Sequence, residues 1–127
     1  MRSNRLQLNA AKTEVLWSTT TRRLHQLPQS SLHVGSDLVA STSVVRNLGI
    51  FIDADVSMRS HVARTVSSCF AILRQLRCVR RSVPRTALQS LVSSLVLSRL
   101  DYGNATLAGI PGHLVQRLQS VMNAAAR

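Results

Sequence analysis

Arginine is the residue type in this sequence whose number and spacing most clearly point to chemistry. Fifteen arginines and one lysine face five acidic residues, which gives a formal net charge of +11 over 127 residues. A guanidinium group carries a planar fork of donors that matches phosphate oxygens. The composition therefore predicts a polyanionic partner. An arginine-rich coding bias would raise the charge without any function, and this alternative stays open.

The spacing of the apolar residues predicts where many of these arginines lie. Apolar residues recur at steps of three and four from Met58 to Leu76, which is typical of an amphipathic helix with one buried face. No acidic residue occurs between Arg59 and Arg99. The arginines that we expect on the outer surface of this helix and the following turn are Arg59, Arg64, Arg74, Arg77, Arg80, Arg81 and Arg85.

A cationic surface of this kind repels itself unless a partner neutralises it, and a phosphate backbone would do so with strongly salt-dependent affinity. Aromatic residues make up only 3% of the chain, so stacking on nucleic-acid bases is not expected. The prediction is binding along the backbone without sequence preference. The competing interpretation is a merely solvated helix face.

Two carboxylates, Asp53 and Asp55, are the best candidates for a metal site. A pair one residue apart could hold Mg²⁺, but a two-metal site needs a further acid, and nothing places Glu14 or Asp101 nearby. A simpler interpretation is that Asp53 or Asp55 caps the following helix, where a carboxylate offsets the helix dipole. We therefore predict no metal site and no cofactor in this chain.

Other sequence features give few signs of an enzyme. No P-loop, GxGxxG, HExxH or GxSxG motif occurs, and the four histidines share no metal-ligand spacing. Cys69 and Cys78 fit reduced thiols, so we expect an intracellular protein, nuclear or cytoplasmic. The longest apolar stretch, Leu91–Leu97, is too short to span a bilayer, and we expect no membrane partner.

The predicted fold class is α+β, with a small β-hairpin region over residues 1–55 and a three-helix bundle over residues 56–127. Strand-forming residues mark Thr13–Trp17, a hairpin over Leu32–Val39, and one long strand over Val44–Ile52 with a bulge or close backbone approach at Gly49. These strands are too few to close a core, so a partner sheet is expected.

The two later helices have clear boundaries. Pro84 suits the start of the second, which runs to Tyr102, and Pro111 opens the third, whose apolar residues lie on one side. Three amphipathic helices can bury one another. The third runs into Arg127 without a capping signal, and both ends of the chain look cut through structure.

Several segments resemble one protein family. Leu8–Glu14 is similar to the LNxxKTE segment of non-LTR (LINE-type) retrotransposon reverse transcriptases, and Val45–Asp53 resembles the strand pair that follows it. Met58–Val62, Ser98–Asn104 and Gln119–Arg127 resemble the helical thumb. The likeness covers nearly the whole chain. The resemblance rests on the order and spacing of these segments taken together.

The resemblance implies roles for individual residues. The family's proton-donating lysine would be Lys12, and its primer grip would be the Gly-containing hairpin over Arg46–Phe51, with Gly49 letting the backbone approach the primer. The helices would be a thumb that holds RNA or an RNA–DNA hybrid through phosphates. In the full-length family this part works with a palm and fingers and with Mg²⁺.

The departures from the family limit the expected activity. The family's metal-binding aspartates, one set in a YxDD-type turn, lie upstream of the matching segments, and this sequence starts after them. Asn47 also replaces the usual aromatic residue before Leu-Gly. We therefore expect a palm-end and thumb fragment of an RNA-directed DNA polymerase that is inactive alone. The alternatives are a stand-alone basic helical module that binds nucleic acid or an acidic protein, and a non-functional remnant.

Overall fold

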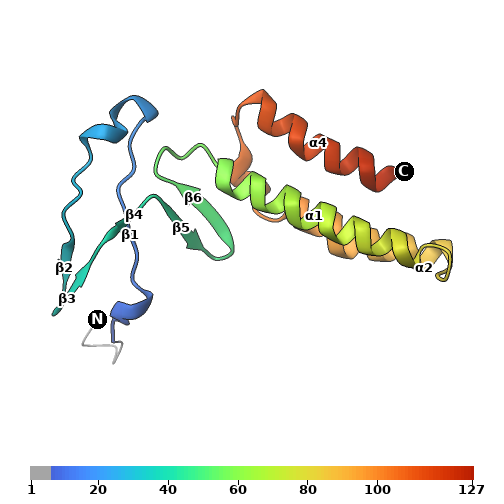
Figure 1. Cartoon of the computed structure of the whole chain (residues 1–127), viewed down its shortest axis with the longest axis horizontal. Helices are drawn as coiled ribbons and strands as arrows, with labels where there is room; N and C mark the ends of the chain where they lie inside the picture. Colours follow the sequence, from blue (N-terminus) through green and yellow to red (C-terminus); the bar gives the residue numbers. More distant parts are fainter. Residues whose placement is uncertain (1–6) are drawn as a thin grey trace. The chain divides into compact units, whose positions relative to one another are not determined.

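The computed structural model describes residues 7–127, and the chain divides into two compact units (Figure 1). The first, the β unit, runs to Ser57, and the second, the helical unit, is Met58–Arg127. The boundary predicted from the sequence, after residue 55, falls close to this division. Short strands precede a mostly helical region, so the predicted α+β class is confirmed.

Short strands in pairs make up the β unit. Leu32–Val34 (β2) and Asp37–Val39 (β3) form the predicted hairpin, while Val44–Asn47 (β5) and Ile50–Asp53 (β6) form a second antiparallel pair. Val15–Leu16 (β1) pairs in parallel with Ser41–Thr42 (β4). Two 3₁₀ helices complete the described part of this unit: η2 (Ala10–Lys12) and η3 (Thr21–Gln26).

The segment from Val44 to Ile52 is not one bulged strand, and that prediction is wrong. Asn47 pairs with Ile50, so Leu48 and Gly49 form a two-residue turn between β5 and β6. Both turn residues have positive φ, 49° and 86°, as a primed hairpin turn requires. Such turns normally carry Asn or Asp before Gly, and Leu48 concealed the turn in the apolar pattern. The hairpin implied by the family resemblance is present.

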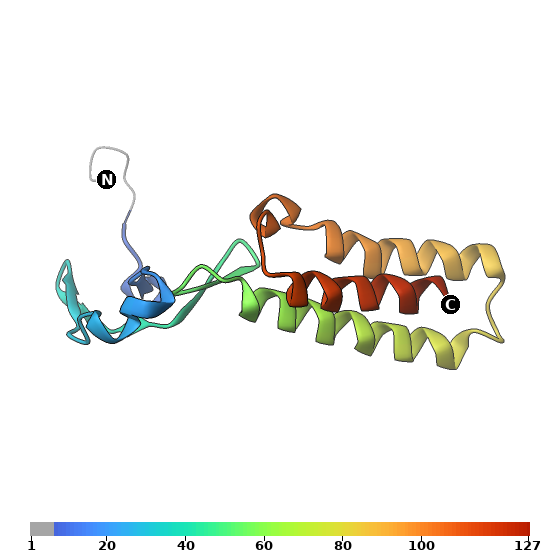
Figure 2. The ribbon, with the colours of Figure 1, turned by 90° about the horizontal axis from the view of Figure 1, so that it is seen from above.

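Helices fill the second unit in the predicted order. The first is α1 (Arg59–Val79), followed by α2 (Arg85–Val92). A π-helical turn η4 (Ser93–Leu97) and the short α3 (Ser98–Asp101) continue α2, and a 3₁₀ turn η5 (Asn104–Leu107) precedes α4 (Gly112–Ala126). Figures 1 and 2 show α1 and the run from α2 to α3 packed together, with α4 lying along one side of this pair.

The buried core lies among these helices. Val62, Val66, Cys69 and Leu73 of α1 pack with Val96 of η4 and with Leu114 and Val121 of α4. These are positions of the predicted apolar stripes, which confirms that the three helices bury one another. The β unit is different: within residues 7–57, Ala54 is the one hydrophobic side chain in the buried class.

No helix in the described part of the chain is both long and apolar enough to cross a membrane.

Candidate nucleic-acid interface

The helical unit concentrates the positive charge of the protein on its surface. Residues 58–127 contain ten arginines, and all ten side chains are exposed. Asp101 is the one acidic residue in this segment of the sequence, and it is also exposed. The other four acidic residues of the chain belong to the β unit. The helical unit is therefore the strongly cationic part of the molecule.

The apolar stripe of α1 determines which way its arginines point. Val62, Val66 and Cys69 are at most 7% exposed, so the opposite side of the helix faces outward. At about 100° per residue, Arg74 and Arg77 lie about 60° apart around the helix axis, whereas Arg64 lies about 140° from Arg77. The α1 arginines therefore form a broad band and not a single line.

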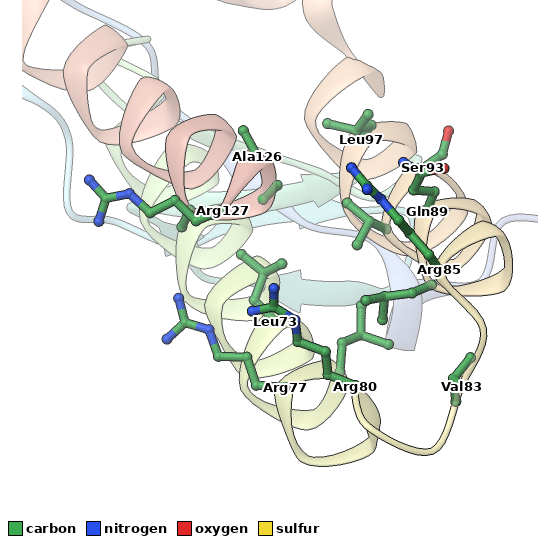
Figure 3. A pocket seen from close by; sticks show the side chains of 15 residues that line it. Leu73, Arg77, Arg80, Val83, Arg85, Gln89, Ser93, Leu97, Ala126 and Arg127 are labelled. Carbon is green, nitrogen blue, oxygen red and sulfur yellow. The ribbon is translucent and has the colours of Figure 1, made fainter.

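Three of the predicted arginines converge where α1 turns into α2. Arg77, Arg80 and Arg85 line one cavity of about 800 Å³, which we call the terminal groove, together with Arg127 at the end of α4. Figure 3 shows Arg77 and Arg80 extending from α1 near Leu73, while Arg85 comes from the start of α2. The remaining predicted arginines, Arg59, Arg64, Arg74 and Arg81, do not line this groove.

The sequence did not predict the positions of two arginines, Arg127 and Arg99. Arg127 joins the groove because α4 lies beside α1, and a single helical pattern carries no information about such a neighbour. Arg99 donates a hydrogen bond from Nη1 to Oγ of Ser68 at 2.6 Å, so it links α3 to α1. Burial raises the pKa of the neighbouring Cys69 thiol, while the charge of Arg99 acts in the opposite direction.

Three of the predicted site residues belong to the β unit: Lys12, Arg46 and Gly49. Lys12 is exposed at the end of η2. Arg46 is exposed on β5, and its guanidinium carbon lies 5.7 Å from the ring centroid of Phe51, its cross-strand partner on β6. This distance is within the range of a cation–π contact. Gly49 has φ 86° in the adjoining turn, a conformation that glycine adopts without strain.

Asp53 and Asp55 do not cap α1, which corrects the predicted role. The N-cap position is Met58, in a left-handed conformation, and the first turn of α1 contains no acidic residue. Asp55 accepts hydrogen bonds from the Ser57 backbone N–H at 3.1 Å and from Thr21 Oγ1 at 3.4 Å, while Ser57 Oγ donates to Asp53 at 3.5 Å. These hydrogen bonds therefore stabilise the loop that precedes α1.

The donor set does not fit a magnesium site. Within residues 7–127, no group of three or more histidine, cysteine or acidic side chains could hold a metal ion. The Asp53 and Asp55 carboxylates are engaged in loop hydrogen bonds and lack a third acid beside them. Any Mg²⁺ used with the family's chemistry would need ligands from outside these residues.

Comparison of the chain with protein-family models, with curated proteins and with solved structures found no significant match.

Proposed function

We propose that the helical unit grips a nucleic-acid duplex by its phosphate backbone, as the thumb of a non-LTR reverse transcriptase does. The observation that carries this proposal is the set of ten exposed arginines against one acidic residue in residues 58–127. Arginine binds phosphate through paired hydrogen bonds and is weakly hydrated, so an array of this density suits a polyanion. The partner that best fits the family resemblance is RNA or an RNA–DNA hybrid.

The β5–β6 hairpin would act as the primer grip in this proposal. Its turn carries Gly49, which allows a close backbone approach, and exposed Arg46 on β5 adds a positive charge. Lys12 would supply a proton to the leaving pyrophosphate only beside a complete palm. The sequence has no YxDD turn, so we expect no polymerase activity from this chain alone.

The salt dependence of binding tests the phosphate contacts directly. Affinity for an RNA–DNA hybrid, measured by fluorescence anisotropy over a range of KCl concentrations, should fall linearly on logarithmic axes. Each neutralised phosphate contributes a slope of about −0.9, so about five contacts give a slope near −4.5. A flat response would contradict the proposal.

A charge-removing variant tests which surface is involved. Arg64→Ala, Arg74→Ala and Arg77→Ala together should weaken hybrid binding and reduce the salt slope by about 2 to 3, because each lost cation removes about one unit. The matched control replaces Arg22, Arg23 and Arg117, which are also exposed but lie outside the predicted interface. Equal losses in the two variants would point to net charge and not to this surface.

A stand-alone basic helical module is the second candidate. The terminal groove favours it, because apolar side chains lie beside the arginines there and phosphates do not need an apolar floor. Competition separates the two: soluble polyglutamate should displace the hybrid only at high excess if the duplex is the natural partner. Displacement of the hybrid by polyglutamate without a high excess would favour an acidic protein as the partner.

A further inference from the structure

The tip of the β5–β6 hairpin carries a leucine at a position where the backbone disfavours one. Leu48 and Gly49 form the two-residue turn, with φ values of 49° and 86°. These values match a type I′ turn, in which asparagine, aspartate or glycine normally stands first. A bulky side chain at positive φ is a conformational outlier. Leu48 therefore makes the hairpin less stable than asparagine would at the same position.

Burial within the chain does not compensate for this strain. The Leu48 side chain is 82% exposed, more than any other large hydrophobic residue of the described part of the chain. Its apolar surface therefore stays in water, where it stabilises the fold little. Backbone outliers that local packing does not explain cluster at binding sites and active sites. The leucine therefore points to a contact that forms when a partner is bound.

The charge near the tip indicates the chemistry of that partner. Arg46 is exposed two residues before Leu48, and its guanidinium carbon lies 5.7 Å from the centroid of the Phe51 ring. This cation–π contact favours one position of the guanidinium group beside the turn. No acidic residue occurs between Asp37 and Asp53. The tip therefore offers an apolar side chain next to a positive charge, which suits a polyanion with apolar surface between its charges.

A nucleic-acid duplex has this alternation of charge and apolar surface. Sugars and base edges lie between its phosphates, and leucine is among the side chains that proteins insert into a minor groove. In an A-form duplex the minor groove is wide and shallow and displays the 2′ position of each sugar. Ribose presents a hydroxyl group there, whereas deoxyribose presents only hydrogen on carbon. A hydroxyl group pressed against leucine loses its water and gains no hydrogen-bond partner.

We propose that Leu48 makes the hairpin select a DNA strand. Its side chain packs against the 2′ face of a deoxyribose in the minor groove of an RNA–DNA hybrid, while Arg46 binds a neighbouring phosphate. This inference rests on the proposed function and deepens it by assigning the sugar specificity to one residue. The exposed arginines of the helical unit do not supply that specificity, because RNA and DNA strands carry the same phosphates.

Duplexes that share one sequence but differ in their sugars are the probes. They are an RNA–DNA hybrid, an RNA–RNA duplex, and an RNA duplex in which one strand carries 2′-fluoro groups, which keep the A-form geometry but remove the hydroxyl donor. Fluorescence anisotropy measures their affinities for the full chain. The hybrid should bind about fivefold more tightly than the RNA–RNA duplex, because only the latter buries an unpaired hydroxyl group against Leu48. The fluorinated duplex should bind within about twofold of the hybrid, because it lacks that hydroxyl group.

Two exposed residues with positive φ provide a matched pair of variants. Val56 has φ 54° and is 58% exposed, but it lies in the loop before α1 and not in the hairpin. Leu48→Asn should reduce the preference for the hybrid to less than about twofold, because the amide can bond to a 2′ hydroxyl group. Val56→Asn should leave the preference near fivefold, since it keeps the leucine at the hairpin tip.

The same variant separates loss of contact from loss of structure. Asparagine followed by glycine is the favoured pair for a type I′ turn, so Leu48→Asn should stabilise the hairpin. NMR should therefore show slower hydrogen exchange at the amides of Asn47 and Ile50, the pair that closes the turn. A variant that stabilises the hairpin and still loses the preference cannot owe that loss to unfolding.

Equal binding of the hybrid and the RNA–RNA duplex, or a preference that survives in Leu48→Asn, would overturn this inference. So would a fluorinated duplex that binds as weakly as unmodified RNA, because the shape of the groove and not the hydroxyl group would then discriminate. These failures differ from failure of the proposed function. A steep salt slope without a preference for the hybrid overturns the role of Leu48 alone, whereas a flat salt response overturns the phosphate contacts.

Discussion

His61 is a buried histidine in the first turn of α1. Its side chain is 5% exposed, and its Nδ1 atom has no hydrogen-bond partner in the described part of the chain. Burial lowers the pKa of His61 because the imidazolium form loses its hydration. The folded protein therefore favours the neutral form of His61 more strongly than the unfolded chain does, and the unfolded chain takes up a proton as the pH falls through about 6.5.

The pH dependence of stability follows from that difference. The contribution of His61 is present above pH 6.5 and is lost below it, because the unfolded state then binds a proton that the folded state does not. The free energy of unfolding should fall by at most about 1.4 kcal/mol per pH unit for this one group. Urea unfolding between pH 7.5 and pH 5 measures the slope. In His61→Leu the slope should become shallower, and an unchanged slope would contradict this account.

Individual residues were predictable where burial alone decides their position. The arginines on and after α1 are exposed because the apolar stripe fixes the buried face of the helix. Asp53 and Asp55 were not predictable in the same way, since they hydrogen-bond within a loop in which Val56 and Met58 have positive φ. Such backbone conformations leave no signature in a pattern of apolar and polar side chains.

The run from α2 to α3 shows how one element departs from a regular helix. Leu88, Val92, Val96 and Leu100 follow one another at steps of four, which would drift around a regular α-helix of 3.6 residues per turn. The wider π-turn η4 compensates for this drift. Val96 is completely buried, while the neighbouring Leu95, an equally apolar residue, is 40% exposed.

Two substitutions check this register. Val96→Ala should lower the free energy of unfolding by roughly 2 kcal/mol, because it leaves a cavity in the core. Leu95→Ala should change it by less than about 0.5 kcal/mol, as expected for a surface position. Urea unfolding followed by circular dichroism measures both values. Equal losses would mean that η4 is a regular α-helical turn in solution.

The elements that the sequence predicted well are those with long periodic patterns. The helix α1 has six buried positions over 21 residues, and all but His61 are apolar and recur at steps of three and four, so its stripe could be recognised without any tertiary information. The β5–β6 hairpin has only four residues per strand, and its turn depends on Leu48 at φ 49°. The π-turn and the terminal groove depend on how separate helices pack, which no single segment encodes.

At the scale of the whole molecule, the two units differ in both charge and core. The helical unit holds the cluster of buried side chains from α1, η4 and α4, together with ten of the fifteen arginines. The β unit has three separate two-stranded sheets and a single buried hydrophobic residue, Ala54, within residues 7–57. Isolated two-stranded pairs are marginally stable in water. The helical unit should therefore fold by itself, whereas the β unit should not.

The two units can be compared as separate fragments. Residues 58–127 should fold alone, with a helical circular dichroism spectrum and a cooperative thermal transition, because their core is formed within the fragment. Residues 1–57 should give a spectrum of largely irregular chain and no cooperative transition. A cooperative transition in the second fragment would mean that the β strands form a core of their own. A β unit that orders only when a palm-like sheet is supplied would instead support our proposal of a reverse-transcriptase thumb, in which these strands need a partner sheet.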